Sequence, residues 1–104
     1  MKAQELYDAT YMASDPSALA SDLHRLAQHT DLDVRMAVAD NRNTHVMTAM
    51  RLAQDNNLDL RYALAENHQI NSDVLALLAK DDNPFIADRA QKTLLRLSQI
   101  APSQ

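Results

Sequence analysis

Histidine is the side chain in this sequence best suited to proton transfer or metal binding. The chain has four histidines, at His24, His29, His45 and His68. The first two are five residues apart and fall on different faces of a helix. No two of them are four residues apart, so the pair of histidines at i and i+4 that a helical zinc site needs is missing. We therefore expect exposed histidines at helix ends, with no metal and no cofactor.

Nucleophilic catalysis needs an activated side chain and a group that stabilises the developing charge. Serine, histidine and aspartate are all present, but no nucleophile elbow accompanies them. Glycine is absent altogether, so a glycine-rich oxyanion turn cannot form. No acid, base or nucleophile can be named, and the sequence predicts a non-enzymatic protein without catalytic residues.

A recurring pair of opposite charges is the clearest electrostatic pattern. Asp33 precedes Arg35, and Asp59 precedes Arg61 in the same way 26 positions later. We expect these four residues to form a charge ladder that ties adjacent structural units and fixes their register, although exposed ion pairs contribute little stability. The alternative is an anion-binding edge made by the two arginines together with Arg42.

A second set of polar residues marks a candidate interaction surface, called here the ridge. It lies on the outward side of the second helix of each unit, and equivalent places are taken by Arg25 and Gln28, Arg51 and Gln54, and Leu77 and Lys80. Stacked helices would align these side chains for binding a partner. The alternative is a solvated face of long side chains.

The elements that must position these residues follow from an internal repeat. The segment DLDVRMAVADN at 31–41 aligns with NLDLRYALAEN at 57–67 at an offset of 26 residues. The same offset superposes Leu-Ala at 26–27, 52–53 and 78–79. Such a period is typical of helical solenoids, in which stacked neighbours bury the apolar face that one unit cannot bury alone.

Apolar spacing within each unit predicts two short helices. Val34, Ala37 and Val38 recur at spacings of three and four, as one buried helical face requires. Asp15-Pro16 and Asn83-Pro84 predict helix starts with proline at the first helical position. Asn41 and Asn67 are expected to adopt the left-handed cap conformation that glycine usually supplies.

The sequence thus predicts an all-α fold, a short right-handed α-solenoid of about three to four two-helix repeats with a 26-residue period. We expect one domain over residues 1–104. Its parts are an N-terminal cap helix within 1–15, repeats over 16–82 and a C-terminal cap helix over 83–100. Tyr7 and Tyr11 form an outer stripe on the first helix, and the tail after Ile100 should fray.

Composition limits the partners. Ten Lys and Arg against 14 Asp and Glu give a formal net charge of -4, which disfavours general binding to a phosphate backbone. Cysteine is absent, which fits a reducing compartment, and no segment has the length of a signal peptide or membrane span. We expect a cytoplasmic protein that does not contact membranes.

The stretch VRMAVADNRNTHVMTAMRLAQDNNLDLRYALAEN, with NHQINSDVLALLAKDDNPFI after it, resembles the variant leucine-rich repeat family, a relative of HEAT-like helical repeats. The resemblance covers roughly residues 16–90. It implies a helical-repeat fold and binding of proteins, or in some branches of DNA. One family member carries an iron–sulfur cluster on cysteines outside its repeats, a feature that this cysteine-free chain cannot share.

These observations predict a non-catalytic protein-interaction module, an adaptor, inhibitor or regulatory subunit that binds through the ridge. The alternative is a nucleic-acid-binding helical repeat with an arginine-lined face, which would have only one Phe and three Tyr for base stacking. Self-association through the ends of the stack is a third interpretation.

Overall fold

The computed structural model describes residues 3–100, and this part of the chain contains helices without any β-strand. The helices are α1 (Ala3–Ser14), α2 (Ala20–Leu26), α3 (Leu32–Asp40), α4 (Val46–Leu52), α5 (Leu58–Ala65), α6 (Ser72–Leu78) and α7 (Pro84–Ile100). The predicted all-α class is confirmed. The tail beyond Ile100, which was expected to fray, lies outside the described residues.

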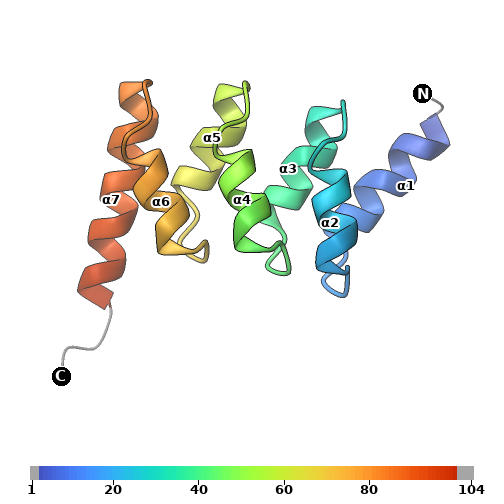
Figure 1. Cartoon of the computed structure of the whole chain (residues 1–104), viewed down its shortest axis with the longest axis horizontal. Coiled ribbons are helices and arrows are strands. Elements are labelled where there is room, and N and C mark those ends of the chain that lie inside the picture. The colour runs from blue at the N-terminus through green and yellow to red at the C-terminus, as the bar shows by residue number, and fades with distance from the viewer. Residues whose placement is uncertain (1–2, 101–104) are drawn as a thin grey trace.

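The helices are arranged in two rows (Figure 1). The short helices α2, α4 and α6 lie side by side in one row, and α1, α3, α5 and α7 form the row behind it. Successive helices run up and down, so the turns that join them alternate between two opposite edges of the molecule. The result is an elongated body of 49 × 31 × 17 Å with α1 and α7 at its opposite ends.

One continuous apolar core runs between the rows. Its fully buried members include Leu23 of α2, Val34 of α3, Leu60 and Leu64 of α5, and Val74 of α6. Leu60 and Leu64 are four residues apart and therefore share one face of their helix. Each short helix alone offers only two or three such side chains, so burial of apolar area depends on its neighbours in both rows.

Polar side chains in the turns start the helices. The Asp31 carboxylate accepts the Asp33 amide at 2.8 Å at the start of α3, and the Asn83 side chain accepts the Phe85 amide at 2.9 Å at the start of α7. Pro84 is the first residue of α7, as predicted. The prediction for Pro16 is wrong, because residues 16–17 form a turn and α2 begins only at Ala20.

Asn41 ends α3 in a way that the sequence did not predict. Its backbone is extended, with φ of -83° and ψ of 125°, and no residue in the described part of the chain has a positive φ. Its side-chain amide instead donates to the carbonyl oxygens of Ala13 at 2.9 Å and Asp15 at 2.8 Å. The asparagine therefore acts between helices, attaching the end of α1 to the end of α3.

The first helix packs on α3 with Ala13 fully buried. Tyr7 and Tyr11 lie on its exposed side, and their rings stack with centroids 6.2 Å apart. Over residues 3–100, no helix combines the length and the apolar character needed to cross a lipid bilayer.

Candidate interaction surfaces

Two arginines of the predicted ladder make two-pronged ion pairs with aspartates 20 positions further along the chain. Arg35 donates from Nε to Asp55 Oδ2 at 2.8 Å and from Nη2 to Oδ1 at 3.3 Å. Arg61 donates in the same way to Asp81, at 2.8 and 3.1 Å. Because the second pair lies 26 positions after the first, the same contact is made twice along the molecule. We call these two pairs the clamps.

Each clamp also holds the backbone of the turns on either side. The third nitrogen of Arg35, Nη1, donates to the carbonyls of His29 and Thr30 at 3.0 and 3.1 Å, and Arg61 Nη1 donates to the Asp55 carbonyl at 2.8 Å. Asp55 and Asp81 each accept the backbone amide two residues ahead, at 2.9 and 2.8 Å. One guanidinium thus joins two successive turns on the same edge of the molecule.

The pKa values of the clamp residues reflect these contacts. The hydrogen bond from Arg61 is the largest influence on Asp81 and, with the Asn83 amide, holds the pKa of Asp81 below its ordinary value in spite of burial. Burial acts most strongly on Asp55 and would raise its pKa. The hydrogen bonds from Arg35 and the Asn57 amide outweigh that effect, so the Asp55 pKa is also lowered. The hydrogen bond to Asp81 in turn raises the pKa of Arg61.

The aspartates expected in the ladder, Asp33 and Asp59, are not the partners of the arginines. Both lie exposed in the first turns of α3 and α5. The ladder was expected between adjacent units, and there the arginines pair with Asp55 and Asp81 instead. The anion-binding edge is not formed either, since Arg35 and Arg61 are engaged by carboxylates and Arg42 lies beyond the other end of α3.

The ladder had a sequence signal that was missed. At both clamps an arginine is followed by an aspartate 20 positions later. The two positions that lie 26 residues before Arg35 and Asp55 hold neither residue type, since they are Ala9 and His29. His29 keeps the turn-forming part of the role, because its ring nitrogen Nδ1 accepts the Asp31 amide at 3.0 Å, and its carbonyl accepts a bond from Arg35 as the Asp55 carbonyl does from Arg61.

The ridge residues lie on α2, α4 and α6 and on the residues that follow them. Five of them face solvent: Arg25, Gln28, Arg51, Gln54 and Lys80. Leu77 is half-buried against the core. Gln28, Arg51 and Gln54 surround a shallow hollow of about 400 Å³ that reaches the first clamp. Arg25 stands apart, with 64% of its side chain exposed, 3.6 Å from Asp22.

The histidines have separate surroundings. His24 Nδ1 lies 2.8 Å from the hydroxyl of Thr48, a buried residue of α4. His45 Nδ1 accepts the Met47 amide at the start of α4, and His68 is exposed. Among residues 3–100, no group of three or more His, Asp or Glu side chains is placed to hold a metal ion.

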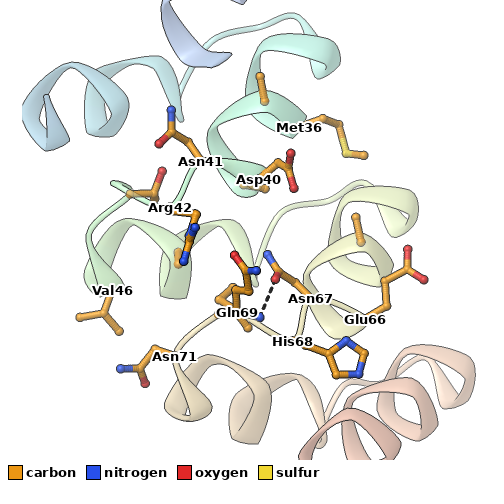
Figure 2. A pocket seen from close by; sticks show the side chains of 16 residues that line it. Met36, Asp40, Asn41, Arg42, Val46, Glu66, Asn67, His68, Gln69 and Asn71 are labelled. Atoms are coloured by element: carbon orange, nitrogen blue, oxygen red, sulfur yellow. Dashed lines mark hydrogen bonds between the residues drawn. The ribbon is translucent and has the colours of Figure 1, made fainter. Parts of the chain in front are cut away.

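One cavity was not predicted from the sequence. It is a cleft of about 1040 Å³ between α3 and α5, at the edge of the molecule opposite the clamps, and we call it the central cleft. Figure 2 shows Met36, Asp40 and Asn41 on the α3 side, and Asn67 and His68 in the turn after α5 on the other side. Four of its polar lining residues carry side-chain amides: Asn41, Asn67, Gln69 and Asn71. The sequence does not distinguish this junction from the one before it, because Asn67 is the same residue type as Asn41, 26 positions earlier.

Comparison with known proteins gives this chain no relative: no protein-family model, no curated protein and no solved structure matches it significantly.

Proposed function

We propose that this chain is a non-catalytic protein-interaction module, built as a short right-handed α-solenoid with a 26-residue period. The two clamps support this architecture, because the same arginine–aspartate contact recurs at that spacing. The resemblance to variant leucine-rich repeats points the same way. The cysteine-free composition fits the cytoplasm, which we propose as the compartment. Rows of paired helices offer a long surface relative to their mass, which suits them to binding.

The observation that carries the proposal is the exposed ridge. Arg25 and Arg51 project from neighbouring helices of the same row, and neither is neutralised by a buried carboxylate as the clamp arginines are. Arginine is enriched at protein interfaces because its flat, forked head makes several hydrogen bonds at once. We infer that the ridge contacts an acidic or polar surface of a protein partner.

The test is charge reversal at the ridge. Tagged protein and its Arg25→Glu, Arg51→Glu double variant are used to capture partners from lysate of the source organism, with and without nuclease. Lys92→Glu with Arg96→Glu, two exposed positions on α7, makes the same charge change away from the ridge and is the matched control. Circular dichroism checks that every variant keeps its helices.

We expect a discrete protein that survives nuclease, binds the control and is lost from the ridge variant. Retained material that disappears on nuclease treatment would instead support nucleic-acid binding, and its affinity should then fall steeply with salt. A partner held equally by all three proteins would show that the ridge is not the contact surface.

A further inference from the structure

Three alanine carbonyls at the ends of successive back-row helices occupy matching places 26 positions apart, at Ala13, Ala39 and Ala65. The Ala13 carbonyl accepts a bond of 2.9 Å from the Asn41 amide, and the Ala65 carbonyl accepts one of 2.6 Å from the Thr93 hydroxyl. The Ala39 carbonyl accepts no hydrogen bond from any residue in the described range 3–100.

The residue that should supply the missing bond is Asn67, 26 positions after Asn41. Its Oδ1 accepts the Gln69 amide at 2.8 Å, as Asn41 Oδ1 accepts the Asn43 amide at 2.9 Å, so both side chains are held in their turns by the same bond (Figure 2). Within residues 3–100 the Nδ2 of Asn67 has no hydrogen-bond partner. Asn67 and Ala39 both line the central cleft, so an unpaired donor and an unpaired acceptor share one cavity.

The side-chain amides of Asn43 and Gln69 differ in the same way as those of Asn41 and Asn67. Asn43 Nδ2 donates to the carbonyls of Pro16 and Ala18 at 2.6 and 3.1 Å, closing the junction between α1 and α3. Its counterpart 26 positions later is Gln69, whose side-chain amide makes no hydrogen bond to the rest of the described chain. The junction between α3 and α5 is therefore open where the previous junction is bonded shut.

An unpaired amide N–H and an unpaired carbonyl in one cleft match a group that offers both partners at once. A secondary amide does so, since its C=O accepts while its N–H donates. The cleft volume of about 1040 Å³ lies just above the range for small-ligand sites, about 300–1,000 Å³, so it has room for several linked amides rather than one.

Charge selects the side chains of such a ligand. Asp40 and Glu66 line the cleft and are exposed at its mouth, while Arg42 is the one arginine or lysine among the described lining residues. Two carboxylates against one guanidinium favour a ligand with positive charge.

We propose that the central cleft binds an extended peptide segment of a partner protein, with a main-chain carbonyl on Asn67 Nδ2, a main-chain N–H on the Ala39 carbonyl, and a Lys or Arg side chain near Asp40 and Glu66. This proposal rests on the protein-interaction role given above and adds a second surface to it. The ridge and the cleft are lined by different residues, so each can fail without the other.

The experiment uses a displayed library of random heptapeptides, selected against the full chain. Enriched peptides are made with a fluorescent label, and their affinity is measured by anisotropy. The key variant is Asn67→Asp, which keeps the oxygen that accepts the Gln69 amide, replaces the donor with an oxygen that repels a main-chain carbonyl, and adds one negative charge. Asp15 occupies the same place one period before Asn41 and accepts the Ser17 amide at 2.8 Å, so aspartate suits this turn.

The matched control is Gln54→Glu, the same amide-to-acid change on the ridge. We expect enriched peptides that contain Lys or Arg, and affinity at least about tenfold weaker for Asn67→Asp, since one hydrogen bond is lost and its acceptor left unpaired. The control should bind normally. In two-dimensional NMR, the side-chain NH₂ signals of Asn67 should move on addition of peptide.

Three outcomes would overturn the proposal. Failure of the library to enrich any sequence would mean that the cleft holds only water. Peptides that bind Asn67→Asp as tightly as the unchanged protein would place their site elsewhere. Peptides weakened by Gln54→Glu alone would assign binding to the ridge, which leaves the interaction role intact and removes the cleft from it.

A second pair of variants tests the charge argument. Asp40→Asn with Glu66→Gln removes two carboxylates from the mouth of the cleft, and Asp33→Asn with Asp59→Asn removes two exposed carboxylates elsewhere. Only the first should weaken binding of a Lys-containing peptide and reduce its salt dependence. Equal effects of the two would refute the assignment of the basic side chain.

Discussion

Removing one carboxylate from the second clamp should destabilise the whole protein. The side chains of Arg61 and Asp81 are only 15% and 8% exposed, so this pair lies much closer to the buried than to the surface class. Breaking a buried pair from one side costs about 3–5 kcal/mol, because it leaves the other charge without compensation. In Asp81→Asn the amide oxygen still accepts one bond from the arginine, so we expect a loss of about 2 kcal/mol.

For a domain of this size such a loss corresponds to a fall in Tm of about 10 °C. Urea unfolding followed by circular dichroism at neutral pH measures the free energy directly. Asp82→Asn, an exposed neighbour that makes the same charge change, is the control and should cost less than about 0.5 kcal/mol. Equal losses for the two variants would refute the idea that the clamp itself holds the turns together.

The same pair predicts a pH dependence. The folded-state pKa of Asp81 is lowered from 3.8 by the hydrogen bond from Arg61, so its contribution is complete above 3.8 and is lost as pH falls through the folded value. The stability difference between the unchanged protein and Asp81→Asn should therefore be constant from neutral pH down to about pH 5 and shrink below 3.8. A difference that grew on acidification would contradict this sign.

Two further substitutions test the junctions between back-row helices. Asn41→Ala removes the bonds to the Ala13 and Asp15 carbonyls, and we expect a loss of about 1–2 kcal/mol together with faster hydrogen exchange confined to α1; uniform exchange along the chain would contradict the attachment role. Thr93→Val keeps the shape of a fully buried side chain but leaves the Ala65 carbonyl unpaired, which should cost about 1–2 kcal/mol in urea unfolding, whereas unchanged stability would mean that water replaces the hydroxyl.

The helices could be predicted because the apolar spacing that forms them is local. Val34 and Val38 are fully buried, as their spacing of four on one helix predicts. The helix start at Pro84 follows from the fixed φ of proline and the capping oxygen of Asn83 before it. The predicted helix start at Pro16 was wrong, because an Asp-Pro pair can also begin a turn, and a turn forms there.

Contacts between units were harder to predict. A repeated arginine indicates a repeated contact, but its partner depends on which turn folds back against it, 20 positions away at Asp55 for Arg35. Asn41 and Asn67 show the limit more plainly. They are the same residue at the same place in the repeat, yet one reaches a neighbouring carbonyl and the other does not. That outcome depends on small differences in how two helices pack, which residue type does not encode.

The junction between α3 and α5 has the first clamp at one edge of the molecule and the central cleft at the opposite edge. Consecutive helices run in opposite directions, so the turns with Asp55 lie at one edge and those with Asn67 at the other (Figure 1). At the first edge Arg35 joins two turns by four hydrogen bonds. At the other edge Asn67 and the Ala39 carbonyl are not hydrogen-bonded to each other. An open cleft beside a fixed edge is a preorganised site, and a peptide that fills it does not first have to separate the helices.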